Sequence, residues 1–195
     1  MKKIALASLL AVFAVSGANA ATNYFVGGSL GFVTDDAHDS QITMAPEFGW
    51  KLNSNWDLGV MADFGYDHHY FGGIDGLYQY GAGMFARYKV AQLGGLKLLL
   101  KGTAGVEFKT VSSEYDAIDG ETFTSIGATI VPMVTYNLTE SFTLYANLNF
   151  LGVYAGYGFE NKDLGIEDNW QFGAVADSDN VMNTSDFQIG FLYNF

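Results

Sequence analysis

The sequence predicts an all-β fold in which eight antiparallel strands form an up-and-down barrel across a membrane. Three observations lead to this prediction. Apolar and polar residues alternate in repeated runs, the connections between the runs are alternately short and long, and only 15% of the 195 residues are charged. Because successive side chains of a strand point to opposite faces, each run has one apolar face and one polar face.

The first twenty residues predict an export signal that is removed from the folded protein. Lys2 and Lys3 give a basic start, residues 4–15 are almost entirely apolar, and Ala18-Asn19-Ala20 has the small-x-small pattern of a cleavage site. The apolar stretch is shorter than the roughly 20 residues of a membrane-spanning helix. We therefore expect a cleavable signal peptide, residues 1–20, and a barrel domain, residues 21–195, in a protein exported by a Gram-negative bacterium.

Eight runs of alternating residues predict the strands of the barrel. They are Asn23–Thr34, Gln41–Leu52, Trp56–Tyr66, Leu77–Val90, Leu96–Val111, Thr122–Leu138, Phe142–Tyr154 and Ser185–Phe195. A helix would repeat its apolar residues every 3.6 positions, and that spacing fits none of these runs. The alternation therefore favours strands throughout.

The connections between these strands predict two different ends for the barrel. Short turns are expected at residues 53–55, 91–95 and 139–141, and longer loops at residues 35–40, 67–76, 112–121 and 155–184. Short turns at one end and longer loops at the other are typical of barrels in bacterial outer membranes. We call these the turn end and the loop end.

The charged residues of the predicted strands all fall on one face. Apart from Asp186 at the loop end of the last strand, they are Glu47, Lys51, Asp57, Asp63, Arg87, Lys89, Lys97, Lys101, Glu107 and Lys109. A basic side chain facing lipid costs about 2–4 kcal/mol near the bilayer midplane, whereas opposite charges can pair across a narrow lumen. We therefore expect the apolar face to contact lipid and the charges to form a network in the lumen. An eight-stranded barrel has an interior just wide enough for side chains, so Glu47, Arg87, Lys97, Lys101, Glu107 and Tyr145 should plug it.

Aromatic residues on the apolar face predict where the two membrane interfaces lie, because such barrels carry a girdle of aromatic residues at each interface. The expected interface aromatics of the turn end are Tyr24, Trp50, Trp56, Tyr88, Tyr136, Phe142 and Phe195. Those expected near the loop end are Phe32, Phe64, Tyr66, Tyr78, Phe108, Tyr154 and Phe187.

The first and last strands give the chain its resemblance to a known family. Residues Tyr24-Phe25-Val26-Gly27-Gly28-Ser29-Leu30-Gly31 and Phe187–Phe195 are similar to the opening and closing strands of small eight-stranded outer-membrane barrels, which include OmpA-type transmembrane domains and opacity-like surface proteins. The resemblance covers Tyr24 to Phe195 and implies an integral outer-membrane protein. The closing alternation of Phe187, Ile189, Phe191, Tyr193 and Phe195 resembles the signal that the barrel-assembly machinery reads during biogenesis.

The acidic balance of the chain bears on its partners. A net charge of −12 is the wrong sign for binding to nucleic acid. Most of the acidic residues fall in the predicted loops or at the loop end, which suits a solvated outer surface. A second interpretation is that these acids bind divalent cations that bridge to lipopolysaccharide phosphates. We expect outer-membrane lipids, including lipopolysaccharide, to be partners of the barrel.

Two histidine-containing segments raise an enzymatic alternative. His38-Asp39-Ser40 has the His-x-Ser spacing of lipid A deacylase barrels, and Asp67-His68-His69 resembles the Asp–His pairs of outer-membrane protease barrels. The first segment is expected in a loop rather than on a membrane-facing strand, and the second needs catalytic partners from other loops. With no cysteine in the chain, thiolate metal sites are excluded. We expect no enzymatic activity, no cofactor and no metal.

The function expected from the sequence is that of an integral outer-membrane barrel with a structural or surface-interaction role of an adhesion-like kind. The alternatives are a small-solute porin and an outer-leaflet lipid-modifying enzyme. The long last loop, Ala155 to Thr184, is the element expected to contact an extracellular partner, because exposed loops on a rigid scaffold often carry recognition.

Overall fold

The computed structural model describes residues 24–34, 40–68, 74–115, 118–162, 164–176 and 187–195. Its strands are β1 (Tyr24–Thr34), β2 (Ser40–Lys51), β3 (Trp56–His68), β4 (Ile74–Leu93), β5 (Leu96–Ser113), β6 (Thr122–Asn137), β7 (Phe142–Leu148), β8 (Leu151–Gly158), β9 (Asn169–Ala176) and β10 (Phe187–Asn194). Within these residues there is no helix with the length and apolar character that a membrane crossing requires.

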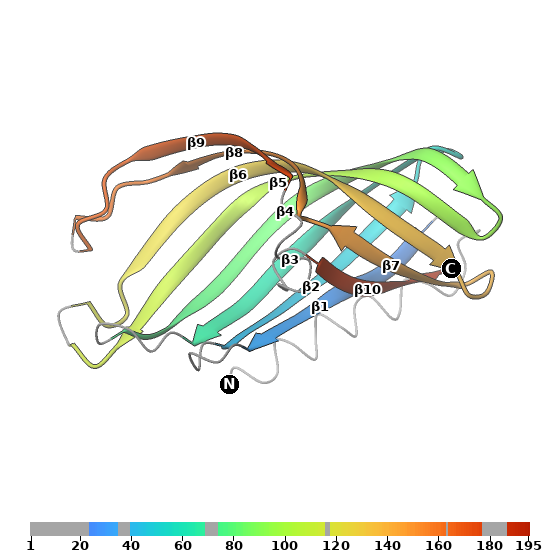
Figure 1. Ribbon diagram of the computed structural model, residues 1–195. Helices are drawn as coiled ribbons and strands as arrows, with labels where there is room; N and C mark the ends of the chain where they lie inside the picture. Colours follow the sequence, from blue (N-terminus) through green and yellow to red (C-terminus); the bar gives the residue numbers. More distant parts are fainter. Residues whose placement is uncertain (1–23, 35–39, 69–73, 116–117, 163, 177–186) are drawn as a thin grey trace.

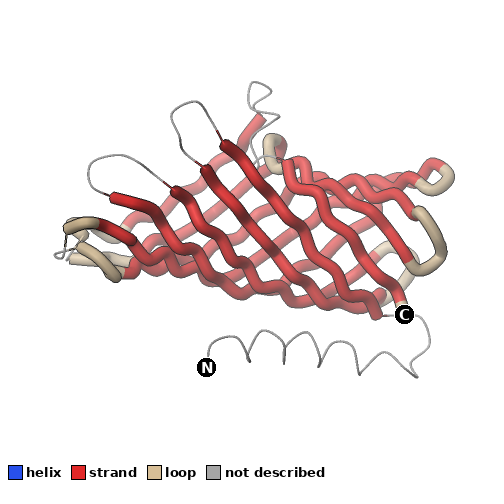
Figure 2. Tube along the Cα trace, turned by 90° about the horizontal axis from the view of Figure 1, so that it is seen from below, coloured by secondary structure: helices blue, strands red, loops and turns tan. Residues whose placement is uncertain are grey.

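The strands close into an eight-stranded antiparallel barrel, which confirms the predicted fold class (Figure 1). Consecutive strands pair with each other from β1 to β7. β7 also pairs with β10, and β10 pairs with β1, which closes the barrel. The closing ladder runs from the pair Phe25–Asn194 to the pair Leu30–Ile189. The strands run obliquely around the wall (Figure 2). Along this ladder, closure provides partners for the backbone N–H and C=O groups of β1 and β10, as a lipid environment requires. Among the described residues, β9 pairs with β8 alone.

The short turns share one end of the barrel and are shaped by local hydrogen bonds (Figure 1). Between β2 and β3, the side-chain oxygen of Asn53 accepts hydrogen bonds from the backbone N–H groups of Asn55 and Trp56, at 2.9 and 3.0 Å. Between β4 and β5 the chain reverses at Gly94, whose φ of 59° is the left-handed conformation that favours glycine. Local sequence therefore fixes where these strands end.

The predicted strand Phe142–Tyr154 is interrupted in the structure, which corrects that prediction. β7 ends at Leu148 and β8 begins at Leu151. β6 pairs with β7 up to Met133 and with β8 from Ile130 onward, so the partner changes across Val131 and Pro132. Proline has no N–H to donate to a ladder, which makes it suited to a break in the pairing.

The interruption reverses which residues of the strand face the lumen. Between the two ladders β6 advances from Met133 to Ile130, three positions, while its partner advances from Asn147 to Val153, six positions. Three extra residues are an odd number, and an odd shift exchanges the two faces of a strand. Odd-numbered residues of β7 therefore face the lumen, whereas even-numbered residues of β8 do.

The predicted loop Ala155–Thr184 is also corrected. Its first residues complete β8, and residues 169–176 form β9, which pairs with β8 from Gly158–Asn169 to Leu151–Ala176. These two strands form the hairpin at the top of Figure 1. We call it the β8–β9 hairpin.

The packed core lies inside the barrel, toward the turn end, while apolar side chains cover its outside. The buried cluster consists of Phe25, Phe85, Leu99, Met133, Tyr145 and Leu192. On the outside, Leu30 and Met84 are 63% and 65% exposed. A water-soluble protein would bury such side chains, so the outer surface is suited to lipid.

Candidate functional site

The lumen holds a buried ion-pair cluster built from three strands. Arg87 of β4 and Lys101 of β5 are direct partners in their ladder, an arrangement of like charges that is unfavourable alone. Glu47 of β2 reaches both across the lumen: one of its carboxylate oxygens accepts a hydrogen bond from Arg87 Nη2, and the other accepts one from Lys101 Nζ at 3.4 Å. The single carboxylate thus offsets the repulsion between the two cations.

Aromatic rings surround the guanidinium of Arg87. Its Cζ lies 4.4 Å from the ring centroid of Phe85, 5.1 Å from that of Phe25 and 5.6 Å from that of Tyr145. Within the described part of the chain, Nε and Nη1 of Arg87 have no hydrogen-bond partner. Aromatic faces attract cations, most strongly where water is excluded. The three rings therefore stabilise the charge of the guanidinium in addition to its hydrogen bond with Glu47.

Glycines on neighbouring strands make room for these rings. Phe25 lies opposite Gly49, Phe85 opposite Gly59, and Tyr145 opposite Gly190. A Cβ added at each of these glycines would collide with the ring opposite it. The rings can therefore lie flat against the inner wall and fill the space around Arg87.

Together Glu47, Arg87, Lys101, Phe25, Phe85 and Tyr145 form what we call the Arg87 plug. All six are buried, and Arg87 is 1% exposed. Two residues expected in the plug lie elsewhere. Lys97 lines a small cavity of about 70 Å³ on the turn side of Arg87. Glu107, whose side chain is 41% exposed, lies on the loop side and pairs with Lys109 at 3.4 Å.

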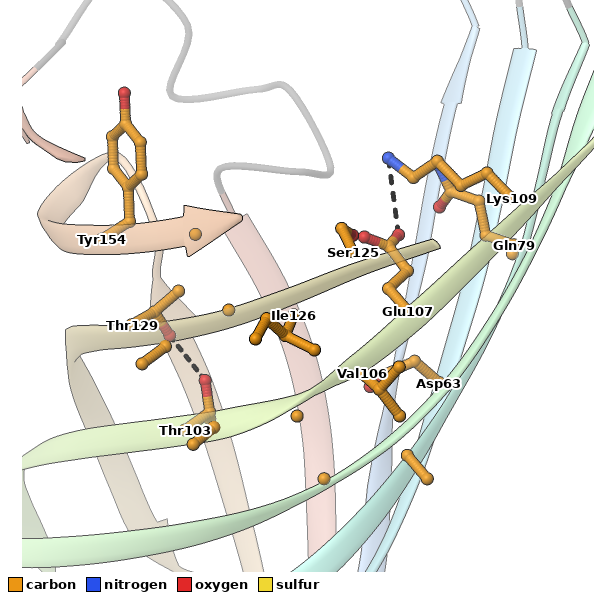
Figure 3. A pocket seen from close by; sticks show the side chains of 18 of the residues that line it. Asp63, Gln79, Thr103, Val106, Glu107, Lys109, Ser125, Ile126, Thr129 and Tyr154 are labelled. Atoms are coloured by element: carbon orange, nitrogen blue, oxygen red, sulfur yellow. Dashed lines mark hydrogen bonds and ion pairs between the residues drawn. The ribbon is translucent and has the colours of Figure 1, made fainter. Parts of the chain in front are cut away.

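On the loop side of the plug the lumen widens into a cavity of about 750 Å³ (Figure 3). Polar groups from several strands line it, and neighbouring hydroxyls pair, as in Thr103 and Thr129 at 2.6 Å. Asn147 Nδ2 donates to Gln188 Oε1 at 3.3 Å near the plug. The cavity also has Phe159 and Ile166, from the turn of the β8–β9 hairpin, in its lining. Lys101 of the Arg87 plug lines this larger cavity, whereas Phe25 and Arg87 line the small cavity of the turn side.

The ladders place all ten charges of the expected lumen network on the inner face. Lys51 lies opposite Asp57, Asp57 opposite Arg87, and Arg87 opposite Lys101. The remaining six lie an even number of positions from these residues on the same strands, so they face the same side. They are Glu47, Asp63, Lys89, Lys97, Glu107 and Lys109. Only three of the ten, Glu47, Arg87 and Lys101, meet in the plug.

The aromatic residues expected at the turn end lie on the outer face and form contacts there. Trp56 and Tyr88 are ladder partners with ring centroids 4.9 Å apart. Tyr24 lies opposite Trp50. Ring contacts also join Phe142 to Phe191 and Tyr193 to Phe195, at 5.8 and 5.2 Å. Tyr136 is half-exposed on the same face.

Tyr154 is expected from the sequence on the outer face, and the structure corrects this. It lies opposite Thr129 of β6 and Gly173 of β9 and is among the residues lining the larger cavity. Its ring covers Gly173, where an added Cβ would contact the ring at 2.7 Å. The change of face follows from the interruption between β7 and β8.

The histidine segments are only partly within the described residues. His38, Asp39 and His69 lie outside them. The β2–β3 ladder places Ser40 opposite His68, and Tyr66 Oη lies 3.4 Å from His68 Nδ1. Among the described residues, no three His, Asp or Glu side chains gather as a metal-binding group.

No protein-family model and no curated protein matches the chain. Solved structures do. The Neisserial surface protein A (NspA) is 15% identical and has a TM-score of 0.55, with 89% of this chain and 96% of that one covered.

Two further matches have lower TM-scores. A major outer membrane protein of Thermus thermophilus is 13% identical with a TM-score of 0.46, covering 90% of this chain and 100% of that one. The attachment invasion locus protein Ail of Yersinia pestis is 14% identical with a TM-score of 0.38, covering 89% and 97%. The likeness to NspA and the closed ladder described above agree with each other. By its fold, the chain is a small eight-stranded barrel of the outer-membrane type.

Proposed function

We propose that this protein is an integral outer-membrane barrel that acts as a structural or surface-interaction protein and does not conduct solutes. The observation that carries the proposal is the burial of the Arg87 plug, of which Lys101 lines the larger cavity and Arg87 and Phe25 line the smaller one. Export through a cleaved signal peptide, residues 1–20, and insertion by the barrel-assembly machinery complete the proposal. The apolar outer face, the aromatic girdles and the likeness of the fold to NspA support the location.

A passage for solutes would require the plug to open. Glu47 would have to leave Arg87 and Lys101, and removing one partner of a buried ion pair costs about 3–5 kcal/mol. The rings of Phe25, Phe85 and Tyr145 hold the guanidinium on its other sides. A closed state is therefore strongly favoured, which argues against the porin alternative.

Conductance across a planar bilayer tests this proposal. Purified wild-type protein should give no large, steady openings. A Glu47→Ala/Arg87→Ala/Lys101→Ala variant, which removes the charged part of the plug, should conduct measurably if it still folds to a heat-modifiable species. Phe32→Ala, a change on the outer face, is the matched control and should remain silent. Large, steady openings from the wild-type protein would overturn the proposal.

Surface interaction, rather than catalysis, is the activity proposed for the exposed side. The described loop-end segments carry exposed acids, including Glu114, Asp119, Glu160 and Asp168, which keep that side solvated and suit contact with cation-bridged lipopolysaccharide. Mass spectrometry of lipid A from an expressing strain checks the enzymatic alternative. Lipid A should be unchanged, and a modification that disappears with His68→Ala would contradict the non-enzymatic role.

A further inference from the structure

The outer face of the β8–β9 hairpin is apolar and strongly exposed. Trp170 and Phe172 of β9 are 78% and 75% exposed. Around them on the same face lie Tyr157 of β8, partner of Trp170, and Ala155, partner of Phe172. No charged residue occurs on this face in the two strands. A hairpin that projected into water would expose these rings at a large hydrophobic cost.

This face continues the outer surface of the barrel without a break. Trp170 pairs with Tyr157, which in turn pairs with Ile126 of β6. The next outward row joins Phe172, Ala155 and Ala128 in the same way. Ile126 is 47% exposed on the outer face. The hairpin is therefore an extension of the wall, with its apolar rows aligned to those of β6.

The register also gives the position of the hairpin along the barrel. Tyr136 belongs to the aromatic girdle of the turn end, and Ile126 precedes it by ten residues on β6. A tilted strand needs about 9–11 residues to cross the hydrocarbon core. Ile126 therefore lies about one membrane crossing from the turn-end girdle, near the opposite interface. Tyr157 and Trp170 continue its ladder row around the wall, and tryptophan and tyrosine are enriched at such interfaces.

The inner face of the hairpin differs in the way that a membrane wall requires. Asn169, Gln171 and Gly173 alternate with the exposed rings, and the first two of them line the larger cavity. The charged residues of this region lie outside the two strands: Glu160 and Lys162 pair at 3.7 Å in the connecting turn, and Asp177 follows the end of β9, outside the described residues. Polar residues toward the lumen, apolar residues outward and charges beyond the strands form the pattern of a transmembrane barrel.

From these observations we infer that the β8–β9 hairpin lies in the membrane, with Trp170 and Phe172 in contact with lipids at the interface of the outer leaflet. The inference rests on the proposed outer-membrane location. It replaces the expected role of this region as a loop that contacts an extracellular protein. The occupant of the exposed surface is the lipid bilayer itself.

Site-specific tryptophan fluorescence in lipid vesicles tests the inference. The chain has three tryptophans, so Trp50→Phe/Trp56→Phe leaves Trp170 as the only one. Two further variants add Trp170→Phe to that background, together with either Gln171→Trp or Phe172→Trp. Each variant is folded into phosphatidylcholine vesicles with and without bromine on the acyl chains, and heat-modifiable gel mobility verifies the barrel.

The expected result follows the alternation of the strand. Because interfacial tryptophan sits at the headgroup level, brominated lipid should reduce the emission from positions 170 and 172 roughly twofold and leave that of the Gln171→Trp variant nearly unchanged. Soluble acrylamide should show the reverse order. Equal lipid quenching at all three positions, or none at positions 170 and 172, would overturn the inference.

A variant that retains only Trp56 separates failure of this inference from failure of the proposed function. Trp56 lies on the outer face at the turn end. Quenching of Trp56 without quenching of Trp170 would show a barrel in the membrane whose hairpin stands in water, which refutes the inference alone. Absence of lipid quenching for both would refute the membrane location and the inference together.

Discussion

Arg87 and Glu47, 40 residues apart in the chain, form an ion pair in which both side chains are 1% exposed. They belong to β4 and β2, which are separated in the wall by β3. The contact therefore crosses the lumen rather than following a ladder, and it exists only once the barrel has curved. The pair therefore depends on the alignment of β2 and β4 through their shared neighbour β3.

Breaking this pair from one side should be costly. Glu47→Gln leaves Arg87 and Lys101 buried beside each other without a carboxylate, and we expect the free energy of unfolding to fall by about 3–5 kcal/mol. Urea titration of the barrel in lipid vesicles, followed by tryptophan fluorescence, measures the change. As a control, Glu47→Met/Arg87→Met/Lys101→Met removes all three charges and should be far less destabilising. A greater loss in the triple variant would show that the charges do not act as a unit.

The glycines beneath the lumen rings should not tolerate a side chain. In Gly59→Ala the new Cβ would meet the ring of Phe85, and overpacking of this kind costs about 1–3 kcal/mol. Gly102→Ala is the control, since its nearest neighbours would lie at 3.8 Å or more, and it should change stability by less than about 0.5 kcal/mol. Adding Phe85→Leu to Gly59→Ala should recover part of the loss. Equal effects of the two alanines would contradict the ring-on-glycine packing.

Neighbouring positions on β6 should respond differently to a charge. Ile130 is 50% exposed on the outer face, about midway between Tyr136 and Ile126, whereas Thr129 lines the larger cavity. Ile130→Lys should cost about 2–4 kcal/mol in a bilayer. Thr129→Lys should cost only the hydrogen bond to Thr103, about 0.5–1.5 kcal/mol. The urea midpoints of the two variants in vesicles provide the comparison, and equal costs would mean that the outer face does not contact lipid.

Shortening the last strand should prevent assembly. Residues 191–195 include four of the six partners that β10 offers to β1, and backbone groups left unpaired in lipid cost several kcal/mol each. A chain lacking these residues should be degraded in the periplasm. Immunoblots of outer-membrane fractions, with and without heating, detect the folded species. Deleting five residues within 177–186 removes the same length without removing a described ladder pair and should be tolerated. A heat-modifiable truncated chain would show that this closure is dispensable.

The sequence by itself determined the fold class and the side on which most residues lie. Strand parity is a local property, so alternation alone placed Glu47, Arg87 and Lys101 inward and Trp56 and Tyr88 outward. It failed for Trp170 and Phe172, because their alternation is short and lies between acidic segments, where it resembled a loop. Only their pairing with β8 shows that these residues belong to the wall.

Tertiary structure decided which of the inward residues meet. Ten charges share the lumen face, yet the register and curvature of the barrel bring only Glu47 to Arg87 and Lys101 and leave Lys97 and Glu107 in separate cavities. The change of partner beside Pro132, which turns Tyr154 inward, likewise depends on pairing between distant strands. Alternation fixes the direction of a side chain relative to its own strand. The position of that side chain along the barrel axis, and the side chains that surround it, depend on how strands far apart in the sequence align. That alignment is set by the ladder hydrogen bonds and packing of the whole barrel.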